Sequence, residues 1–357
     1  MLFDLNPKDS PKELFGREEE LDELVRLIKA RRWVTLLGPR MVGKTSLVKV
    51  ANTRLDHNAV YVNLWGVKST QGLLNALVNG LNSSRSLSQK IRDGVQRVEG
   101  LSFGPGGISV TAPKKPMRTM WDLLGVVGRL KGDHVIELDE VQELAVISGQ
   151  LLKMLGNIFN SYPNIVFVFT GSVFGLMKTL IDPGSSSPLY GRPPAKLYLK
   201  PFDERKASDF LAKGFEECRM KVPVDVIAKV IEERLDGKPG WLTLYGNNAA
   251  VGKLPLDKAL DETVAEGLKI VRDELNHFLS GRGRQAYLSA LKAAATSARW
   301  SEVKGAIEAG RRSPVNDGTV SRVLDGLKAA MLIDDREGVY RVNDPILRTL
   351  LLTGKMT

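Results

Sequence analysis

The chain has 357 residues, of which 43% are hydrophobic, 26% are charged and 6% are aromatic. This balance is typical of a packed protein with two or three domains, and it excludes a disordered chain. No apolar run approaches the ~20 residues that span a bilayer, and residues 1–10 lack the basic and apolar regions of a signal peptide. The single cysteine, Cys218, cannot form an internal disulfide. We therefore expect a cytoplasmic protein without membrane segments.

The charge balance favours a polyanionic partner. The chain has 51 Lys and Arg residues and 41 Asp and Glu residues, which gives a formal net charge of +10. Nucleic acids are attracted by such a surplus, but a merely solvated basic surface fits the same composition. The composition leaves both alternatives open.

The first part of the chain alternates helical patterns with short apolar runs. Residues 15–30 predict an amphipathic helix, because Leu21, Leu24, Val25 and Ile28 recur at helical spacing. A second helix is predicted over residues 45–55. Short runs typical of buried strands lie at residues 33–37, 59–64, 134–138, 165–169 and 196–199. Five such strands separated by helices predict an α/β fold with a parallel sheet that is covered on both faces.

Residues 83–118 interrupt this alternation. The segment has a Ser-rich start, a glycine turn at residues 104–107 and a basic stretch around Lys114 and Lys115. We interpret it as an excursion above the sheet that contains a hairpin.

The strands stop after Pro201. Helical patterns at residues 204–214, 224–235, 241–251 and 256–275 predict a helical lid. Helices are then predicted at residues 284–295, 301–309 and 318–330, followed by two short apolar segments at residues 332–333 and 339–342. Three helices followed by a hairpin is the order of a winged helix. We therefore predict a phosphate-loop domain over residues 1–202, a lid over residues 203–275 and a winged helix over residues 276–357.

A complete phosphate-binding loop pattern lies between the first predicted strand and the second predicted helix. It consists of Gly38-Pro39-Arg40-Met41-Val42-Gly43-Lys44-Thr45, and we include the next residue, Ser46, in the nucleotide site. Glycines let the backbone N–H groups turn toward a β-phosphate, and the helix that follows adds the positive end of its dipole. Lys44 would reach the β- and γ-phosphates, and Thr45 would ligate Mg²⁺. The loop therefore predicts binding of a nucleotide with Mg²⁺.

A second strong pattern is the apolar strand that ends in Asp139 and Glu140. Asp139 would hold Mg²⁺ through water, and Glu140 would polarise a water for in-line attack on the γ-phosphorus. An ordinary acidic turn is the alternative, but the phosphate loop favours the catalytic interpretation. The chain has no Asn-Lys-x-Asp motif for guanine, which favours adenine and therefore ATP.

Two weaker patterns follow. Thr170-Gly171-Ser172 comes directly after a predicted strand, where a polar side chain can contact the γ-phosphate or the attacking water, although a plain turn fits nearly as well. Arg192 lies in a loop before the fifth strand, where an arginine can stabilise transferred charge. A solvated arginine is the alternative there.

In their order along the chain, these motifs resemble the archaeal ATPase family, relatives of the STAND and AAA+ P-loop ATPases. The motifs that carry the resemblance are residues 15–21, Pro39-Arg40 inside the phosphate loop, residues 138–140, residues 170–172, residues 189–192 and Pro201-Phe202. The resemblance implies that Gly16 and Arg17 lie near the adenine, that Ser172 senses the γ-phosphate and that Arg192 is a switch arginine.

The resemblance also extends to the predicted lid. Residues 237–241, which include Pro239, are similar to a motif that packs on the nucleotide from the lid, although a helix-breaking turn fits the same residues. One departure from the family is Glu137, which places a charge inside the otherwise apolar strand. That charge leaves open how deeply the strand end is buried.

These motifs lead to one main functional hypothesis and two alternatives. We expect an ATP-binding, slowly hydrolysing switch that couples its nucleotide state to the placement of its domains. A kinase for a small acceptor is one alternative, but such kinases do not carry a winged helix. The other is a DNA-binding regulator similar to archaeal replication initiators, in which ATP only locks a conformation.

Duplex DNA is the expected partner of the predicted winged helix. In the helix at residues 318–330 an apolar face should pack inward and a polar face should remain outside. The inward residues are Val320, Val323, Leu324 and Leu327, and the outward residues are Thr319, Ser321, Arg322 and Lys328. Residues 276–357 have 13 Lys and Arg against 8 Asp and Glu, a balance of +5. The acidic turn at residues 334–337 instead fits packing, a protein partner or self-association.

Overall fold

The computed structural model describes residues 1–55, 58–171 and 176–354. The chain divides into two compact units. We call the unit of residues 8–38 and 44–199 the sheet unit, and the unit of residues 1–7, 39–43 and 200–357 the helical unit. The five central residues of the phosphate loop therefore group with the helical unit.

The sheet unit contains a five-stranded parallel sheet, as predicted. Its strands are β1 (Val34–Leu37), β2 (Asn58–Asn63), β5 (His134–Asp139), β6 (Ile165–Thr170) and β7 (Ala195–Tyr198), in the spatial order β2-β5-β6-β1-β7. β1, β5 and β6 are buried along their whole length, which explains their continuous apolar sequences. All carboxyl ends lie at one edge of the sheet, where the phosphate loop and the acidic pair begin.

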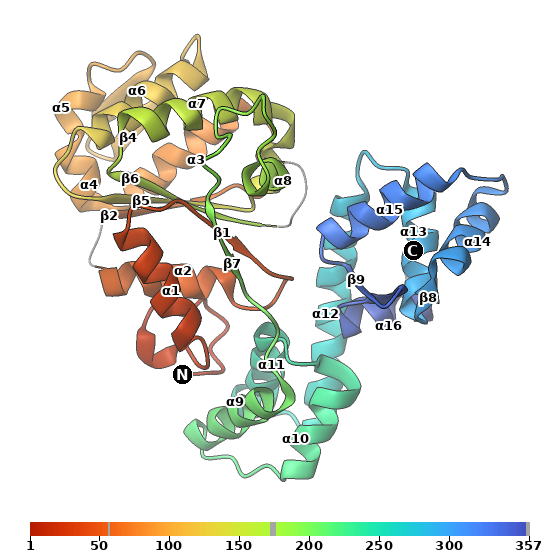
Figure 1. The fold of residues 1–357 in the computed structure, drawn as a ribbon. Coiled ribbons are helices and arrows are strands. Elements are labelled where there is room, and N and C mark those ends of the chain that lie inside the picture. The colour runs from red at the N-terminus through yellow and green to blue at the C-terminus, as the bar shows by residue number, and fades with distance from the viewer. Residues whose placement is uncertain (56–57, 172–175, 355–357) are drawn as a thin grey trace. The chain divides into compact units, whose positions relative to one another are not determined.

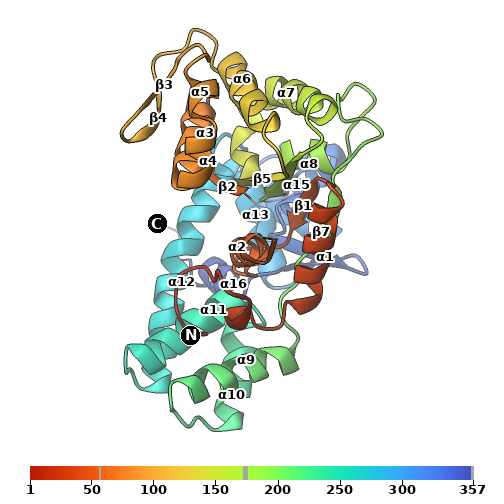
Figure 2. The same cartoon turned by 90° about the vertical axis from the view of Figure 1, so that its left-hand side faces the viewer.

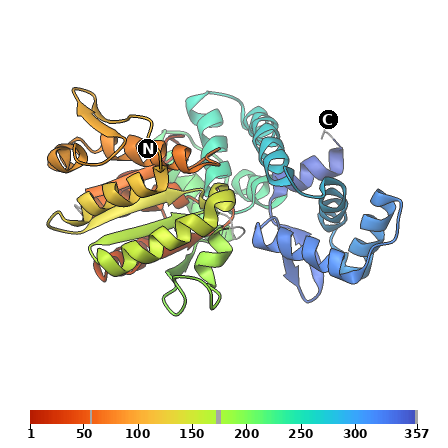
Figure 3. The same ribbon diagram turned by 90° about the horizontal axis from the view of Figure 1, so that it is seen from above.

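Helices cover both faces of the sheet (Figure 1). α1 (Glu18–Lys29) and α2 (Lys44–Leu55) lie on one face, and α3 (Thr70–Ser83), α6 (Pro116–Gly128) and α7 (Ser148–Ser161) lie on the other. Figure 3 shows α6 and α7 side by side above the strands. The predicted inward face of α1 is buried at Leu21, Leu24, Val25 and Ile28. Two shorter elements, a 3-10 helix at Val141–Ile147 and α8 (Leu176–Ile181), pack against each other.

The excursion contains the predicted hairpin. α4 (Arg85–Lys90) and α5 (Arg92–Val95) precede β3 (Leu101–Gly104) and β4 (Gly107–Val110), which pair antiparallel. The Asn82 side chain from α3 fixes β4, because its amide donates to the Ile108 carbonyl and accepts from the Ile108 N–H, both at 2.8 Å.

The helical unit begins with α9 (Glu204–Glu217), α10 (Val224–Val230), α11 (Pro239–Gly246) and α12 (Leu256–Leu279). These helices confirm the helical pattern, but π-helical turns at Ile231–Leu235 and Asn247–Val251 extend α10 and α11. Phe3, near the N-terminus, is fully buried in this unit. Its ring lies where a Cβ at Gly214 or Gly246 would be, within 2.3 Å and 2.2 Å respectively, so both positions require glycine.

The last part of the chain consists of four helices and a small sheet. The elements are α13 (Arg284–Ala295), β8 (Ala298–Arg299), α14 (Trp300–Arg311), α15 (Asp317–Ala329), β9 (Ile333–Arg336), β10 (Val339–Val342) and α16 (Pro345–Thr353). The strands form an antiparallel sheet in the order β8-β10-β9. The predicted inward residues of α15 are all buried, and Ser321 and Arg322 are exposed. β8 and α16 were not predicted.

No helix among the described residues combines the length and apolar character that crossing a membrane requires.

Candidate active site at the carboxyl edge of the sheet

The phosphate loop leaves β1 with a tightly curled backbone. Gly38, Met41 and Gly43 have positive φ angles of 156°, 66° and 91°. A Cβ at Gly43 would meet no described atom within 4 Å, so the backbone there borders open space. Lys44 Nζ donates to the Gly38 carbonyl at 2.9 Å, and α2 begins at Lys44. A curled loop at a helix N-terminus fits the polyphosphate of a nucleotide.

The middle of this loop is held by residues of α11 and α12 in the same unit. The Gly240 N–H donates to the Met41 carbonyl at 2.8 Å. A Cβ at Gly240 would lie 2.7 Å from Met41 Cε, so only glycine allows this approach. Arg40 Nε lies 2.5 Å from Oε1 of Glu274 on α12. Pro239, the predicted lid residue, is the first residue of α11 and directly precedes the contact.

Three hydroxyl groups converge on the carboxylate of Asp139, which is only 7% exposed. Tyr61 Oη donates to Oδ2 at 2.6 Å, Thr45 Oγ1 lies 3.4 Å from the same oxygen, and Thr170 Oγ1 bonds Oδ1. The hydroxyls come from β2, α2 and β6, and Asp139 ends β5. A carboxylate beside a threonine hydroxyl is the oxygen donor set that Mg²⁺ prefers. The predicted metal residues Thr45 and Asp139 are therefore brought together.

Tyr61 is a site residue that the sequence did not predict. Its ring lies on β2, opposite Glu137 in the sheet register. Burial raises the pKa of the phenol well above its ordinary value, and the charge of Asp139 raises it further, so Tyr61 remains a donor. Its only signal in the sequence is a hydroxyl-bearing residue in a predicted strand. That signal becomes informative only when β2 is known to neighbour β5.

Glu140, the predicted base, directly follows Asp139 in a left-handed conformation with φ 62° and ψ 47°. Such a conformation is costly for a non-glycine residue. Gln142 Nε2 bonds Glu140 Oε2. Gln142 Oε1 lies only 2.1 Å from where a Cβ at Gly171 would be, so the turn after β5 fits against the bare backbone after β6. This packing orients the Glu140 carboxylate.

Glu137 is only 1% exposed, so the end of this strand is deeply buried despite the charge in its sequence. Burial raises its pKa to about 8, the hydrogen bond from Asn52 opposes that shift, and the nearby Asp139 charge adds to it. The carboxyl is therefore mostly neutral at pH 7. A neutral glutamate is compatible with an otherwise apolar strand.

Comparison with known proteins now defines the family. Residues 14–244 match the family of ATPase domains found predominantly in Archaea. The chain belongs to this archaeal P-loop ATPase family. No curated protein matches it.

Solved structures extend the similarity of this chain beyond the matched domain. The match to a Walker-type ATPase of Pyrococcus abyssi covers 99% of this chain and 100% of that protein's chain, at 27% identity and a TM-score of 0.77. The match to the ORC2 protein of Aeropyrum pernix, in complexes with ADPNP and ADP, covers 99% of this chain and 98% of that protein's chain, at 16% identity and a TM-score of 0.60. The second likeness is one of fold.

The residues that the resemblance placed near the adenine lie at the start of α1. Gly16 has a φ of 63°, and its N–H donates to Glu18 Oε1 at 3.2 Å. Arg17 is 4% exposed and pairs with Glu20 at 2.8 Å. Ser46 Oγ accepts from the Lys8 N–H at 3.1 Å. The predicted γ-phosphate sensor, Ser172, lies outside the described residues.

Arg192 does not join the carboxyl edge of its own sheet. Ala195, which begins β7, pairs with Val34, the first residue of β1. The loop that carries Arg192 therefore lies at the amino edge, one β1 length of about 10 Å from the phosphate loop. There the exposed guanidinium bonds Asn160 Oδ1 at 2.5 Å and stacks 5.7 Å from the Phe159 ring centroid. A role at the nucleotide would require a second chain.

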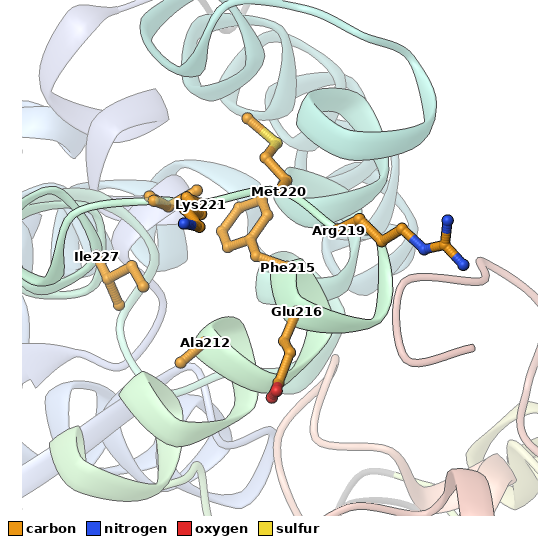
Figure 4. Close-up of a pocket in the computed structure, with 8 residues that line it drawn as sticks. Ala212, Phe215, Glu216, Arg219, Met220, Lys221 and Ile227 are labelled. Carbon is orange, nitrogen blue, oxygen red and sulfur yellow. The ribbon is translucent and has the colours of Figure 1, made fainter.

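A separate cavity of about 430 Å³ lies between α9 and α10 (Figure 4). Its lining includes Phe215, Met220 and Ile227 together with the charged Glu216, Arg219 and Lys221. None of the predicted nucleotide residues lines it.

Proposed function

We propose that this archaeal ATPase is a cytoplasmic molecular switch that binds ATP with Mg²⁺, hydrolyses it slowly and couples the nucleotide state to the arrangement of its parts. The observation that carries the proposal is the fixed carboxylate of Asp139. Three hydroxyls hold it at the carboxyl edge of the sheet, beside the helix that begins with Lys44.

The roles follow from the chemistry of the residues. Lys44 would bind the β- and γ-phosphates, and Thr45 and Asp139 would hold Mg²⁺. When bound, Mg²⁺ neutralises charge on the phosphates. Glu140 would accept a proton from the attacking water, as a general base placed by its turn. The bond between the γ-phosphorus and the bridging oxygen would break, and ADP and inorganic phosphate would be the products.

The lid would sense the nucleotide through the phosphate loop. We retain the division into an ATPase domain (1–202), a lid (203–275) and a winged helix (276–357) as part of the proposal. The sensing role is supported by the hydrogen bond between Gly240 and Met41. Through this bond, a shift of the phosphate loop would displace Pro239 and the start of α11.

We further propose that residues 276–357 form a winged helix that contacts duplex DNA. The order of three helices and a β9–β10 hairpin supports this assignment. Arg311, Arg312 and Arg322 are exposed around α15, where phosphate contacts would form. The hairpin itself is acidic, and Arg336 is paired with Asp334 at 2.8 Å, which favours a protein partner or self-association as the alternative.

A second candidate function is a DNA-binding regulator in which ATP only locks a conformation. One specific observation favours it. The segment that touches the phosphate loop at Gly240 also bonds α16, because Lys238 pairs with Asp344. This connection would transmit a change caused by nucleotide binding from the phosphate loop to α16 without any hydrolysis.

Binding and turnover of the full chain test the proposal. Lys44→Ala should weaken ATP binding and abolish turnover, whereas Glu140→Gln should still bind ATP with Mg²⁺ while turnover falls by ~10² or more. Lys258→Ala and Glu262→Gln, two exposed positions of α12, are matched controls. Unchanged affinity in Lys44→Ala would sink the nucleotide site. Tight ATP binding without turnover in the wild type would favour the regulator in which ATP only locks a conformation.

A further inference from the structure

Two segments account for the net positive charge of the chain. Residues 83–118 have seven Lys and Arg against two Asp and Glu, a balance of +5. Residues 276–357 also carry +5, and the other 239 residues are neutral, with 31 of each sign. The excursion therefore holds half of the net charge of +10 in a tenth of the chain. It belongs to the sheet unit, and neither the nucleotide site nor the proposed winged helix includes it.

Five of the seven cations of this excursion are available to a partner. Lys90, Arg92, Arg97, Lys114 and Lys115 are all exposed. None of these five has a carboxylate partner in the described part of the chain, whereas Arg118 is paired with Asp122 at 3.0 Å. In the C-terminal segment, by contrast, three of the cations are neutralised. They are Lys304 with Asp317, Lys328 with Asp325 and Arg336 with Asp334.

The excursion presents these cations on a defined scaffold. Figure 2 shows the β3–β4 hairpin extending from the corner formed by α3, α4 and α5. The Arg92 guanidinium lies 5.7 Å from the ring centroid of Phe103 on β3. At the base of the hairpin, the Thr111 N–H donates to the Gly100 carbonyl at 2.8 Å. Gly100 also packs against Pro113, which a Cβ would approach within 2.3 Å.

These base contacts return the chain to the start of the hairpin. Lys114 and Lys115 follow Pro113 directly, and Arg97 lies three residues before Gly100. The Thr119 hydroxyl then bonds the Glu99 carbonyl at 3.0 Å. Cations on both sides of the hairpin are therefore brought to one end of it.

The tip of the hairpin carries little side-chain volume. It consists of Gly104-Pro105-Gly106-Gly107, and a Cβ at Gly104 or Gly106 would meet no described atom within 4 Å. A narrow two-stranded ribbon of this kind fits into the major groove of B-DNA, which admits either a helix or a β-ribbon. Cations at its base would then face the phosphates that border the groove.

The excursion does not have the composition of a protein-binding surface. The centre of a protein interface is usually built on exposed aromatic or aliphatic side chains. None of the exposed large hydrophobic residues of the described chain lies between residues 83 and 118. Phe103 is half-buried and lies beneath Arg92.

We propose that residues 83–118 form a sequence-independent contact surface for the phosphate backbone of duplex DNA, separate from the C-terminal module. This inference rests on the proposed duplex-DNA role of the protein and not on ATP turnover. It makes the sheet unit a DNA-contacting part in its own right.

Salt-dependent binding of the full chain tests the surface. The probe is a fluorescein-labelled 30-base-pair duplex of random sequence. The protein is titrated into it in the presence of ADP, at KCl concentrations between 50 and 200 mM. R97A/K114A/K115A should bind about tenfold more weakly at 50 mM KCl, and the slope of log affinity against log salt should flatten by up to about 3. The matched control K229A/K258A/K269A removes three exposed lysines from α10 and α12, and it should leave the slope unchanged.

Two further measurements distinguish this surface from the C-terminal module and from a site for RNA. R311A/R312A/R322A tests the C-terminal module, so a flattened slope in that variant alone would overturn the excursion surface while leaving the proposed winged-helix role intact. Single-stranded RNA of equal length is the competing probe. Loss of RNA affinity without loss of duplex affinity in R97A/K114A/K115A would overturn DNA as the partner. No duplex binding by the wild type at 50 mM KCl would also overturn DNA as the partner, whereas ATP binding by the same protein preparation without ADP tests the switch independently.

Discussion

Lys238 and Asp344, 106 residues apart in the chain, form an ion pair in which the lysine is buried. The Lys238 side chain is 2% exposed. The same Asp344 oxygen accepts a hydrogen bond from Trp241 Nε1 at 3.2 Å, and its other oxygen caps α16 through the N–H groups of Ile346 and Leu347. Through this pair, the segment that contacts the phosphate loop is joined to the last helix.

Breaking the pair should destabilise the helical unit strongly. Asp344→Asn leaves a buried ammonium while keeping the cap, so it should cost about 3 kcal/mol or more. Lys238→Met leaves a half-buried carboxylate that keeps its three N–H donors, so it should cost less. The double variant should recover much of that loss, because it leaves no unpaired charge. Thermal unfolding of all four proteins measures the coupling. Additive effects would mean that the two charges do not depend on each other.

Tyr61→Phe should impair the metal site without unfolding the protein. The ring stays, but Asp139 loses the donor at 2.6 Å, and a hydrogen bond to a charged group is worth about 1.5–3 kcal/mol. Turnover should fall about tenfold, and the Mg²⁺ concentration for half-maximal turnover should rise, whereas ATP affinity in EDTA should stay constant. Tyr198→Phe, an exposed tyrosine on β7, is the control. An unchanged Mg²⁺ dependence would remove Tyr61 from the site.

Glu137 should make the stability of the metal-free protein pH-dependent. Its pKa is raised from an ordinary value of 4.5 to about 8 in the folded chain. The folded state therefore holds a proton that the unfolded state has released. Stability from the neutral carboxyl is fully present below pH 4.5 and is lost as the pH rises through about 8.

Glu137→Gln isolates this effect, because glutamine keeps the shape and remains neutral. In EDTA, the melting temperature of the wild type should fall more steeply between pH 6 and pH 8.5 than that of the variant. All other titrating groups are shared by the two proteins. Parallel profiles would show that Glu137 ionises normally.

Arg192→Ala should leave the nucleotide affinity of a dilute, monomeric chain unchanged within about twofold, because the arginine lies at the amino edge of its own sheet. If it acts as a switch arginine, it acts on the nucleotide of a second chain. In that case the variant loses only the part of turnover that rises with protein concentration. A loss of ATP affinity at high dilution would instead place Arg192 in its own site.

Much of the fold could be predicted because its signals are local. A buried parallel strand requires a continuous apolar run, and the runs ending at Leu37 and Leu138 are therefore visible in the sequence. The phosphate loop is recognisable because its glycines and Lys44 act over eight consecutive residues. The elements missed include α4 and α5 in the excursion and β8 and α16 near the end of the chain. The last two gain their stability from packing against α12, α13 and β10.

The sequence by itself therefore determined which residues meet within one strand, one turn or one loop, including Asp139 with Glu140. Only the tertiary structure decided which distant segments meet. Tyr61 reaches Asp139 because β2 pairs with β5, and Arg192 is carried away because β7 begins level with the start of β1. Strand order and register arise from packing over the whole sheet, whereas periodicity and turn chemistry are set by neighbouring residues. For that reason the local motifs could be predicted, and their long-range partners could not.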